Sequence, residues 1–213
     1  VRYLRAAPDA EVAEIMVADG QSTDATAAAA AAAGARVVGC PQRGRAAQMN
    51  HGAARAQGEL LYFLHADTFP PPDFLARIQA AVTQGYGSGC FRLQFDHPHW
   101  FLRLSAWFTR FPVDLVRFGD QSLFVRRTVF ERAGGFRSEL LVLEDQEIVP
   151  RLRRHGRFVV LPAAVVTSAR KYLDNGVFRL QGVFLLVCVL YRLRVPQPRL
   201  RAVYRALIRQ DKI

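Results

Sequence analysis

The stretch VADGQSTD at residues 17–24 joins a short apolar run to an alanine-rich segment, and this junction decides the fold class. The apolar run favours a buried strand that ends near Asp19, and the hydroxyl and carboxylate side chains after it can cap a helix. A second acidic stretch, FLHADT at residues 63–68, follows another apolar run, and a third, LEDQE, lies at residues 143–147. Acids just past the carboxyl ends of buried parallel strands lie along one sheet edge, where α/β proteins bind ligands. Such acids can hold a ribose, a divalent cation or a proton, which indicates an enzyme acting on a nucleotide-linked substrate.

Strands and helices are expected to alternate through the first half of the chain, after the tail of a helix at residues 1–6. The expected strands are 14–18, 36–39 and 60–64, and the expected helices are 24–33, 45–57 and 73–84. This alternation predicts an α/β fold with a mostly parallel sheet, flanking helices and right-handed crossovers. A doubly wound fold normally begins with a strand, so we expect that an opening strand and its loop are missing before Val1, through truncation or disorder.

The second half of the chain is less regular. The expected strands are 88–96, 122–126, 157–161 and 165–168, and the expected helices are 98–111, 128–133, 144–155, 177–193 and 199–210. No internal repeat or low-complexity linker divides the sequence. Residues 1–213 are therefore expected to form a single domain, in which residues 14–170 carry the motifs and residues 177–213 form C-terminal helices.

Composition limits the class of protein. Of the 213 residues, 51% are hydrophobic and 22% are charged, which is typical of an ordered globular protein with a substantial core. The formal net charge of +11 can attract anionic lipid, a nucleotide sugar or nucleic acid. The aromatic and basic motif of RNA-binding domains is not visible, which disfavours a nucleic-acid reader. The three cysteines are widely spaced, show no disulfide or zinc pattern, and suit a reducing, cytoplasmic location.

Two of the acids follow expected strands. Asp19 can accept hydrogen bonds from a base or ribose, and the alternative is a well-capped turn without a ligand. Asp67 precedes a proline cluster that directs the chain over the sheet edge, where a carboxylate can coordinate Mg²⁺ or Mn²⁺ between two phosphates. His65 lies two residues earlier and points to the same side of an extended chain. It is a candidate second metal ligand, with a capping hydrogen bond as the alternative.

Further polar residues mark the rest of the candidate site. Asp145 opens an expected helix and is a candidate general base for an attacking hydroxyl, although acids are also common at helix N-termini. Arg45, at the start of another helix, suits phosphate oxygens, and a solvated basic turn is the alternative. Asp120 and Gln121 precede a strand and can orient an acceptor or serve as plain turn residues. Arg170 can neutralise a departing diphosphate or be one more surface arginine.

Six short segments occur in an order that suggests a family. They are VADGQSTD (17–24), GRAAQMN (44–50), FLHADT (63–68), GDQ with FVRR (119–127), GGF (134–136) and ED (144–145). In this order they resemble family-2 glycosyltransferases of the GT-A fold, over about residues 14–170. The chain is most similar to the bacterial branch named transferase 2, radical-SAM/selenodomain-associated.

This resemblance implies roles for individual residues. Asp19 resembles the acid that contacts the base or ribose of the donor nucleotide, and the segment with Arg45 and Gln48 resembles the one that lines the donor site. Asp145 resembles the catalytic base. Asp67 resembles the last acid of the family's Asp-x-Asp metal motif. The sequence departs from the wider family at His65, where the first acid would stand, although the resembling branch commonly has His-Ala-Asp.

The resemblance also implies a reaction. We expect a hexosyltransferase that moves a sugar from a nucleoside-diphosphate donor to an unknown glycan or lipid-linked acceptor, with inversion and with Mn²⁺ or Mg²⁺ as cofactor. A sugar nucleotidyltransferase can use the same strand-end acids, and it would release pyrophosphate from a nucleoside triphosphate. The third alternative is a basic nucleic-acid-binding module, which would show steep salt dependence.

Two apolar segments leave a membrane role open. The aromatic segment 98–111 and the apolar run 183–191 can form a membrane-facing or lipid-acceptor surface at the inner face of the plasma membrane, and several arginines lie beside the second of them. Core packing explains both segments equally well. The run of nine apolar residues is too short to span a bilayer.

Overall fold

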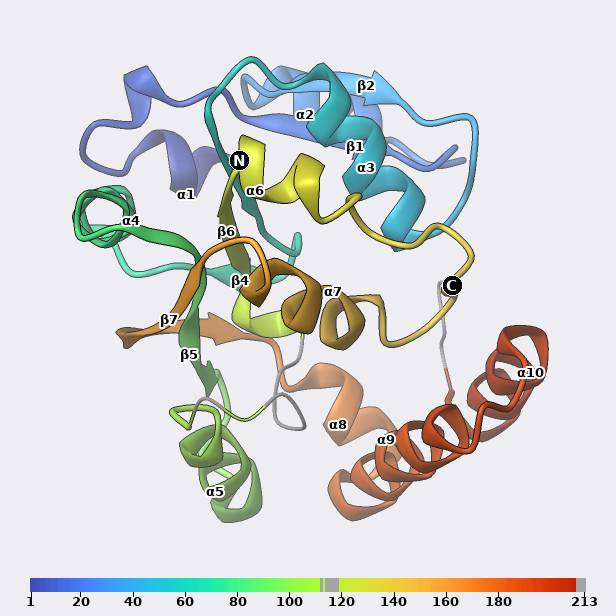
Figure 1. Ribbon diagram of the computed structural model, residues 1–213. Coiled ribbons are helices and arrows are strands. Elements are labelled where there is room, and N and C mark those ends of the chain that lie inside the picture. Colours follow the sequence, from blue (N-terminus) through green and yellow to red (C-terminus); the bar gives the residue numbers. More distant parts are fainter. Residues whose placement is uncertain (112, 114–118, 210–213) are drawn as a thin grey trace.

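Two sheets form the centre of the structure, which is a computed structural model that describes residues 1–111, 113 and 119–209 (Figure 1). The smaller sheet pairs β1 (Met16–Asp19) with β2 (Arg36–Gly39) in parallel. The larger sheet has the order β3-β6-β5-β7-β4. Its strands are β3 (Leu60–Phe63), β4 (Thr68–Phe69), β5 (Tyr86–Phe95), β6 (Leu123–Arg126) and β7 (Arg157–Thr167).

The larger sheet is mixed. Among its described pairs only β5 and β7 run parallel, whereas β3 with β6, β6 with β5, and β7 with β4 are antiparallel. The α/β class with flanking helices is confirmed, but the sheet is mixed rather than mostly parallel. The difference arises because β6 enters between β3 and β5 after a long connection, and such long-range pairing leaves no local sequence signal.

Helices flank both sheets. They are α1 (Arg2–Arg5), α2 (Thr26–Ala32), α3 (Arg45–Arg55), α4 (Phe74–Thr83), α5 (Trp100–Phe108), α6 (Arg127–Arg132), α7 (Glu144–Arg153), α8 (Arg170–Asn175), α9 (Val177–Arg192) and α10 (Gln197–Leu207), with short 3₁₀ turns η1 (Ala10–Val12) and η3 (Gly119–Gln121). The expected last helix reached residue 210, which lies outside the described residues. In Figure 1, α9 and α10 lie at the opposite end of the molecule from β1 and β2.

Two expected strands turn out to be one. The segments 157–161 and 165–168 were expected to be separate strands, but one continuous strand, β7, covers residues 157–167. The register between β5 and β7 shifts between Phe91 and Arg92, so that Pro162 falls within a bulge. A bulge accommodates proline because no ladder hydrogen bond is required there. The strand β4 and the helix α8 were not predicted.

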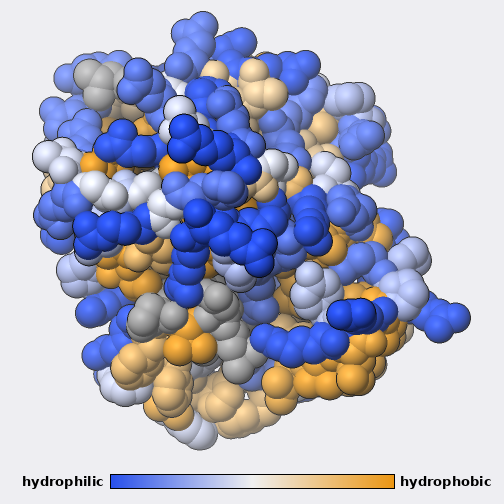
Figure 2. Space-filling view, in the orientation of Figure 1, coloured by the Kyte–Doolittle hydropathy of each residue, from blue (hydrophilic) through white to orange (hydrophobic). Residues whose placement is uncertain are grey.

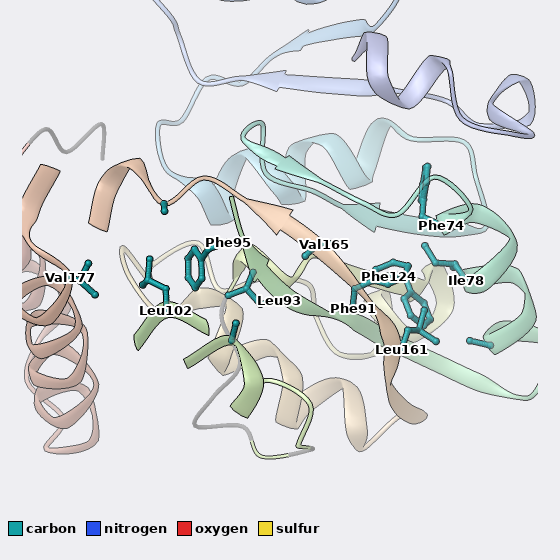
Figure 3. Close-up of a cluster of buried hydrophobic side chains, with 13 residues drawn as sticks. Phe74, Ile78, Phe91, Leu93, Phe95, Leu102, Phe124, Leu161, Val165 and Val177 are labelled. Atoms are coloured by element: carbon teal, nitrogen blue, oxygen red, sulfur yellow. The ribbon is translucent and has the colours of Figure 1, made fainter. Parts of the chain in front are cut away.

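The main core lies against β5 and β7 (Figure 3). It contains Phe91 and Phe124, both fully buried, together with Ile78 of α4 and Leu102 of α5. At Gly89 in β5 an added Cβ would lie 2.5 Å from the carbonyl oxygen of Val159 and 2.5 Å from the Phe124 ring. Glycine is therefore required where β5 is packed most closely between its neighbours.

Two further apolar clusters hold other helices. One packs α3, α6 and α7 against β3 and β6, and the other joins α9 to α10. Arg127 strengthens the first, because its guanidinium donates to the carbonyl oxygens of Ala53, Ala56 and Gly58 at the end of α3, at 2.6–3.0 Å. Within the described residues, no helix is long and apolar enough to cross a membrane.

Candidate active site

The turn after β1 brings Asp19 and Gln48 together. The Asp19 carboxylate accepts a hydrogen bond from the backbone N–H of Ser22, with N···O distances of 3.2 and 3.4 Å. Gln48 of α3 donates from Nε2 to the carbonyl oxygen of Ala18 at 2.9 Å. A Cβ on Gly20 would lie 2.7 Å from the Gln48 amide, so this side chain lies directly over the glycine. Gln48 therefore fixes α3 to the end of β1, beside Asp19.

Arg45 connects α3 to α7. It is the first residue of α3, and its Nε donates to Glu144 Oε1 at 2.6 Å. Its Nη2 lies 3.6 Å from Asp145 Oδ2. The sequence indicated phosphate as the partner of Arg45. In the structure its guanidinium forms ion pairs with two carboxylates that lie about a hundred positions further along the sequence.

Glu144 is the site residue that sequence reasoning missed, since it was interpreted as an ordinary acid at a helix N-terminus. Its side chain is 1% exposed, and Oε2 has no hydrogen-bond partner within the described residues. Burial raises the pKa of Glu144, and the adjacent Asp145 charge adds to the effect, although Arg45 opposes it. Partial removal from water would by itself lower the pKa of Arg45, but the charges of Glu144 and Asp145 outweigh this effect and raise that pKa. The neighbouring Asp145 was the only sequence signal.

Asp145 lines a pocket. Its side chain is 17% exposed. The pocket is lined by Met49, Phe63, His65, Cys90, Gln121, Ser122, Leu123, Asp145, Val149 and Phe158. Most of these side chains are apolar, and the polar ones include His65 and Asp145. A mostly apolar pocket with a few convergent polar groups is typical of a binding site for a small molecule.

His65 also lies close to Asp120. Its Nδ1 is 3.7 Å from Asp120 Oδ1. Asp67 is exposed in the turn between β3 and β4, in which the Thr68 N–H donates to the His65 carbonyl oxygen at 3.2 Å. Burial is the main cause of the raised pKa of Tyr172 in α8, and the negative charge of Asp120 raises it further. The structure therefore places His65 and Asp145 in the lining of the pocket, Asp120 beside His65, and Asp67 on the adjoining turn.

These donors are compatible with a hard divalent cation. In the part of the chain that the structure describes, no three His, Cys, Asp or Glu side chains cluster to hold a metal ion by themselves. Mg²⁺ and comparable ions usually keep several waters, however, and are bound by one or two carboxylates together with substrate phosphates. The Asp67 carboxylate, with the His65 nitrogen two residues earlier, offers such a partial donor set.

Two more predicted residues differ from each other in their contacts. Gln121 lines the pocket but is buried, and its amide donates to the Phe91 carbonyl oxygen at 3.0 Å, which stabilises the pocket wall. Arg170 is exposed as the first residue of α8. The described contacts do not join it to Arg45, His65 or Asp145.

Comparisons with known proteins identify a family and a fold. The model of glycosyl transferase family 2 matches residues 2–135. The structure is similar to the mannosyltransferase PcManGT from Pyrobaculum calidifontis, solved with GDP-Man and Mn²⁺, with a TM-score of 0.64 and 22% identity over 89% of this chain and 59% of that one. It is also similar to glucosyl-3-phosphoglycerate synthase from Mycobacterium tuberculosis, solved with phosphoglyceric acid, with a TM-score of 0.60 and 17% identity over 86% of this chain and 70% of that one.

A third similar structure is S. aureus TarS 1-349 with UDP-GlcNAc, with a TM-score of 0.58 and 16% identity over 73% of this chain and 49% of that one. The chain thus spans 59% of the mannosyltransferase chain and 49% of the TarS 1-349 chain. No curated protein matches the sequence. At these identities the likeness shows the fold, which is that of the GT-A glycosyltransferases.

Proposed function

The chain belongs to glycosyl transferase family 2, and from this premise we propose that it transfers a sugar from a nucleoside-diphosphate donor to an acceptor hydroxyl. One observation carries the proposal: Asp145 lines the same pocket as His65, and its Oδ2 lies 3.6 Å from Nη2 of Arg45. A carboxylate in a pocket, fixed by a charged partner, is suited to accept a proton from a bound hydroxyl.

Asp145 is the proposed general base. The acceptor hydroxyl enters the pocket, and its oxygen attacks the anomeric carbon while Asp145 takes its proton. The bond from the anomeric carbon to the nucleoside diphosphate breaks in the same displacement, so the configuration is inverted. Arg45 positions the Asp145 carboxylate, and Glu144 in turn positions Arg45 through the hydrogen bond of 2.6 Å.

Asp19 is the proposed contact for the donor nucleotide. Its carboxylate accepts from the Ser22 N–H, and an ionised carboxylate keeps further lone pairs for a ribose hydroxyl or a base N–H. Gln48 stabilises this turn through its hydrogen bond to the Ala18 carbonyl oxygen. Arg45 is the proposed contact for the diphosphate. Structurally similar enzymes were solved with GDP-Man, UDP-GlcNAc and UDP-Glc, which differ in both base and sugar. We therefore propose a nucleoside-diphosphate sugar and select no base.

A divalent cation, Mn²⁺ or Mg²⁺, is the proposed cofactor. Asp67 would hold it, with His65 as a second ligand. When bound, the cation would offset the negative charge of the diphosphate leaving group. Structurally similar enzymes were solved with Mn²⁺. Asp120, 3.7 Å from His65, is the proposed contact for the acceptor, and Gln121 supports it indirectly because its own amide is bound to Phe91. Arg170 remains a proposed diphosphate contact.

The finer assignment rests on the motifs. The six motifs and their order support membership of the radical-SAM/selenodomain-associated branch of bacterial enzymes, and we propose a cytoplasmic hexosyltransferase formed by one domain, residues 1–213. The proposed acceptor is a glycan or a lipid-linked molecule.

The test is release of nucleoside diphosphate from UDP-Glc, UDP-GlcNAc and GDP-Man in the presence of Mn²⁺. Slow hydrolysis of the donor serves as the assay while the acceptor is unidentified. Asp145→Asn should lower turnover by at least about 10²-fold, because the amide cannot accept the proton. Binding of nucleoside diphosphate should be unchanged, since the amide is nearly isosteric.

Asp73→Asn is a matched control, because Asp73 is an exposed acid paired with Arg77 on α4. It should leave turnover at the wild-type level. Near-normal turnover of Asp145→Asn would refute the assignment of the base. Release of pyrophosphate from a nucleoside triphosphate would instead identify a nucleotidyltransferase, and salt-sensitive binding of oligonucleotides alone would identify a nucleic-acid-binding module.

A further inference from the structure

One side of α9 is apolar and exposed. Its exposed large side chains are Phe178, Leu185, Leu186 and Val189, followed by Leu193 just after the helix. At about 100° per residue, these positions fall within one arc of roughly 100° around the helix axis. The opposite side of α9 packs against α10 through residues such as Val183 and Val187. The core therefore accounts for one side of α9 and leaves the other apolar side at the surface.

The neighbouring helix α5 has a matching stripe. Trp100, Leu104, Trp107 and Phe108 are exposed, with Trp100 at 63%. The same helical arithmetic places these four within one arc of roughly 100°. Monomeric soluble proteins rarely expose extended apolar patches, so a stripe with two tryptophans marks a surface that binds something.

The two stripes join into one surface. The Phe178 ring of α9 lies with its centroid 5.0 Å from that of Phe101 and 6.0 Å from that of Trp100, both in α5. We name the combined surface of these exposed residues the α5–α9 face. Figure 2 shows hydrophobic residues gathered along the lower edge of the view, where Figure 1 places α5 and α9.

The two segments that carry the α5–α9 face are basic. Residues 97–113 contain two arginines and no acid, and residues 175–210 contain seven arginines and no acid. By the same helical arithmetic, Arg179 and Arg192 fall at the two edges of the α9 stripe. An apolar stripe with basic residues at its edges fits a lipid surface. The apolar side chains would pack among the acyl chains, and the arginines would contact the anionic headgroups.

We propose that the α5–α9 face binds the surface of a bilayer that contains anionic phospholipid. The helix α9 has 16 residues, which makes it roughly 24 Å long against a hydrocarbon thickness of roughly 30 Å. Because the exposed apolar stripe runs along the side of α9, binding through this face would place the helix in the plane of the interface. The membrane binding goes beyond the proposed sugar transfer and does not depend on it.

The test is flotation of the purified chain with vesicles. Vesicles of phosphatidylcholine with phosphatidylglycerol should carry the protein, and vesicles of phosphatidylcholine alone should bind it far less. The double variant Leu185→Gln with Val189→Gln should weaken binding at least about tenfold, because two side chains no longer enter the apolar layer. Phe69→Gln is the matched control, since Phe69 is an exposed apolar residue of β4 outside this face, and it should bind like the wild type.

Variants that remove a positive charge separate the electrostatic contribution to membrane binding from the apolar one. Arg103→Gln and Arg192→Gln should each weaken binding to the anionic vesicles about fivefold, and added salt should reduce the difference. Circular dichroism and nucleoside-diphosphate binding report folding and the donor site separately. Failure of a folded protein to float with anionic vesicles would overturn the proposal. A dimer in solution that the double glutamine variant dissociates would also overturn it, because the face would then bind a second copy.

Discussion

Replacing Arg45 with methionine tests the ion-pair network that positions the proposed base. Arg45 stands between the buried Glu144 and Asp145, with N···O distances of 2.6 and 3.6 Å. Methionine retains much of the apolar stem and removes the charge and the hydrogen bonds. The variant leaves Glu144 buried without its counter-ion, and such an uncompensated charge destabilises the folded state.

The magnitude follows from the geometry. Opposite charges about 4 Å apart attract by about 4 kcal/mol at an effective dielectric constant of about 20. The Arg45 side chain is 47% exposed, so solvent screens part of this attraction. We expect Arg45→Met to lower the free energy of unfolding by about 2–3 kcal/mol at neutral pH, which corresponds to a fall in Tm of about 5–10 °C for a protein of this size.

The protonation of Glu144 determines how the stability of the two proteins changes with pH. The pKa of Glu144 in the folded protein is raised above its ordinary value of 4.5. The stability that this group contributes is therefore fully present below pH 4.5 and is lost as the pH rises through the raised pKa. Arg45 opposes that rise, so the variant should lose more stability than the wild type between acidic and neutral pH.

Thermal denaturation across this pH range measures the effect. The Tm difference between wild type and Arg45→Met should be largest near neutral pH and should shrink below pH 4.5, where Glu144 is neutral in the folded and unfolded states. Adding Glu144→Gln to Arg45→Met should recover most of the lost stability at neutral pH. A Tm difference that is the same at acidic and neutral pH would refute the reasoning.

Two other predictions concern the donor side of the site. Mn²⁺ should tighten the binding of a nucleoside diphosphate to the wild type but not to Asp67→Ala. Titration calorimetry with and without chelator measures this difference. An equal effect of Mn²⁺ on both proteins would show that Asp67 is not a metal ligand. Gly20→Ala should displace the Gln48 amide and cost about 1 kcal/mol of unfolding free energy, as Gln48→Ala should. Because both remove the same hydrogen bond, the double variant should be no less stable in thermal denaturation than Gln48→Ala, and additive losses would contradict the contact.

Local patterns predicted most elements, and pairing between distant strands was out of reach. The strand β2 (Arg36–Gly39) agrees with its expected bounds, and α3 (Arg45–Arg55) ends two residues before its expected end. Helical periodicity and turn residues act over a few positions, so a sequence shows them directly. The insertion of β6 between β3 and β5 depends on packing between segments far apart in the chain, which no local pattern records.

The same limit applies to the motif around Asn50. Its place in the segment 44–50 suggested the donor site. In the structure its amide donates to the Phe136 carbonyl oxygen at 2.7 Å and accepts from the Phe136 N–H at 2.9 Å, across 86 positions of sequence. Asn50 therefore fixes the glycine-rich turn at Gly135 to α3. A polar residue in a motif can serve the fold or a ligand, and only its spatial partners distinguish the two.

Arg45 shows why partners must be counted before a ligand is assigned. From sequence, an arginine at a helix start suits phosphate, because the guanidinium and the helix N-terminus both favour anions. In the folded chain two carboxylates from α7 already occupy that guanidinium. A donor diphosphate that contacts Arg45 must therefore compete with Glu144 and Asp145, and it can do so only where the guanidinium keeps donors for a third anion. Arg45 has five N–H donors and about half its side chain is exposed, so the diphosphate can approach it from the solvent side while Glu144 holds it in place.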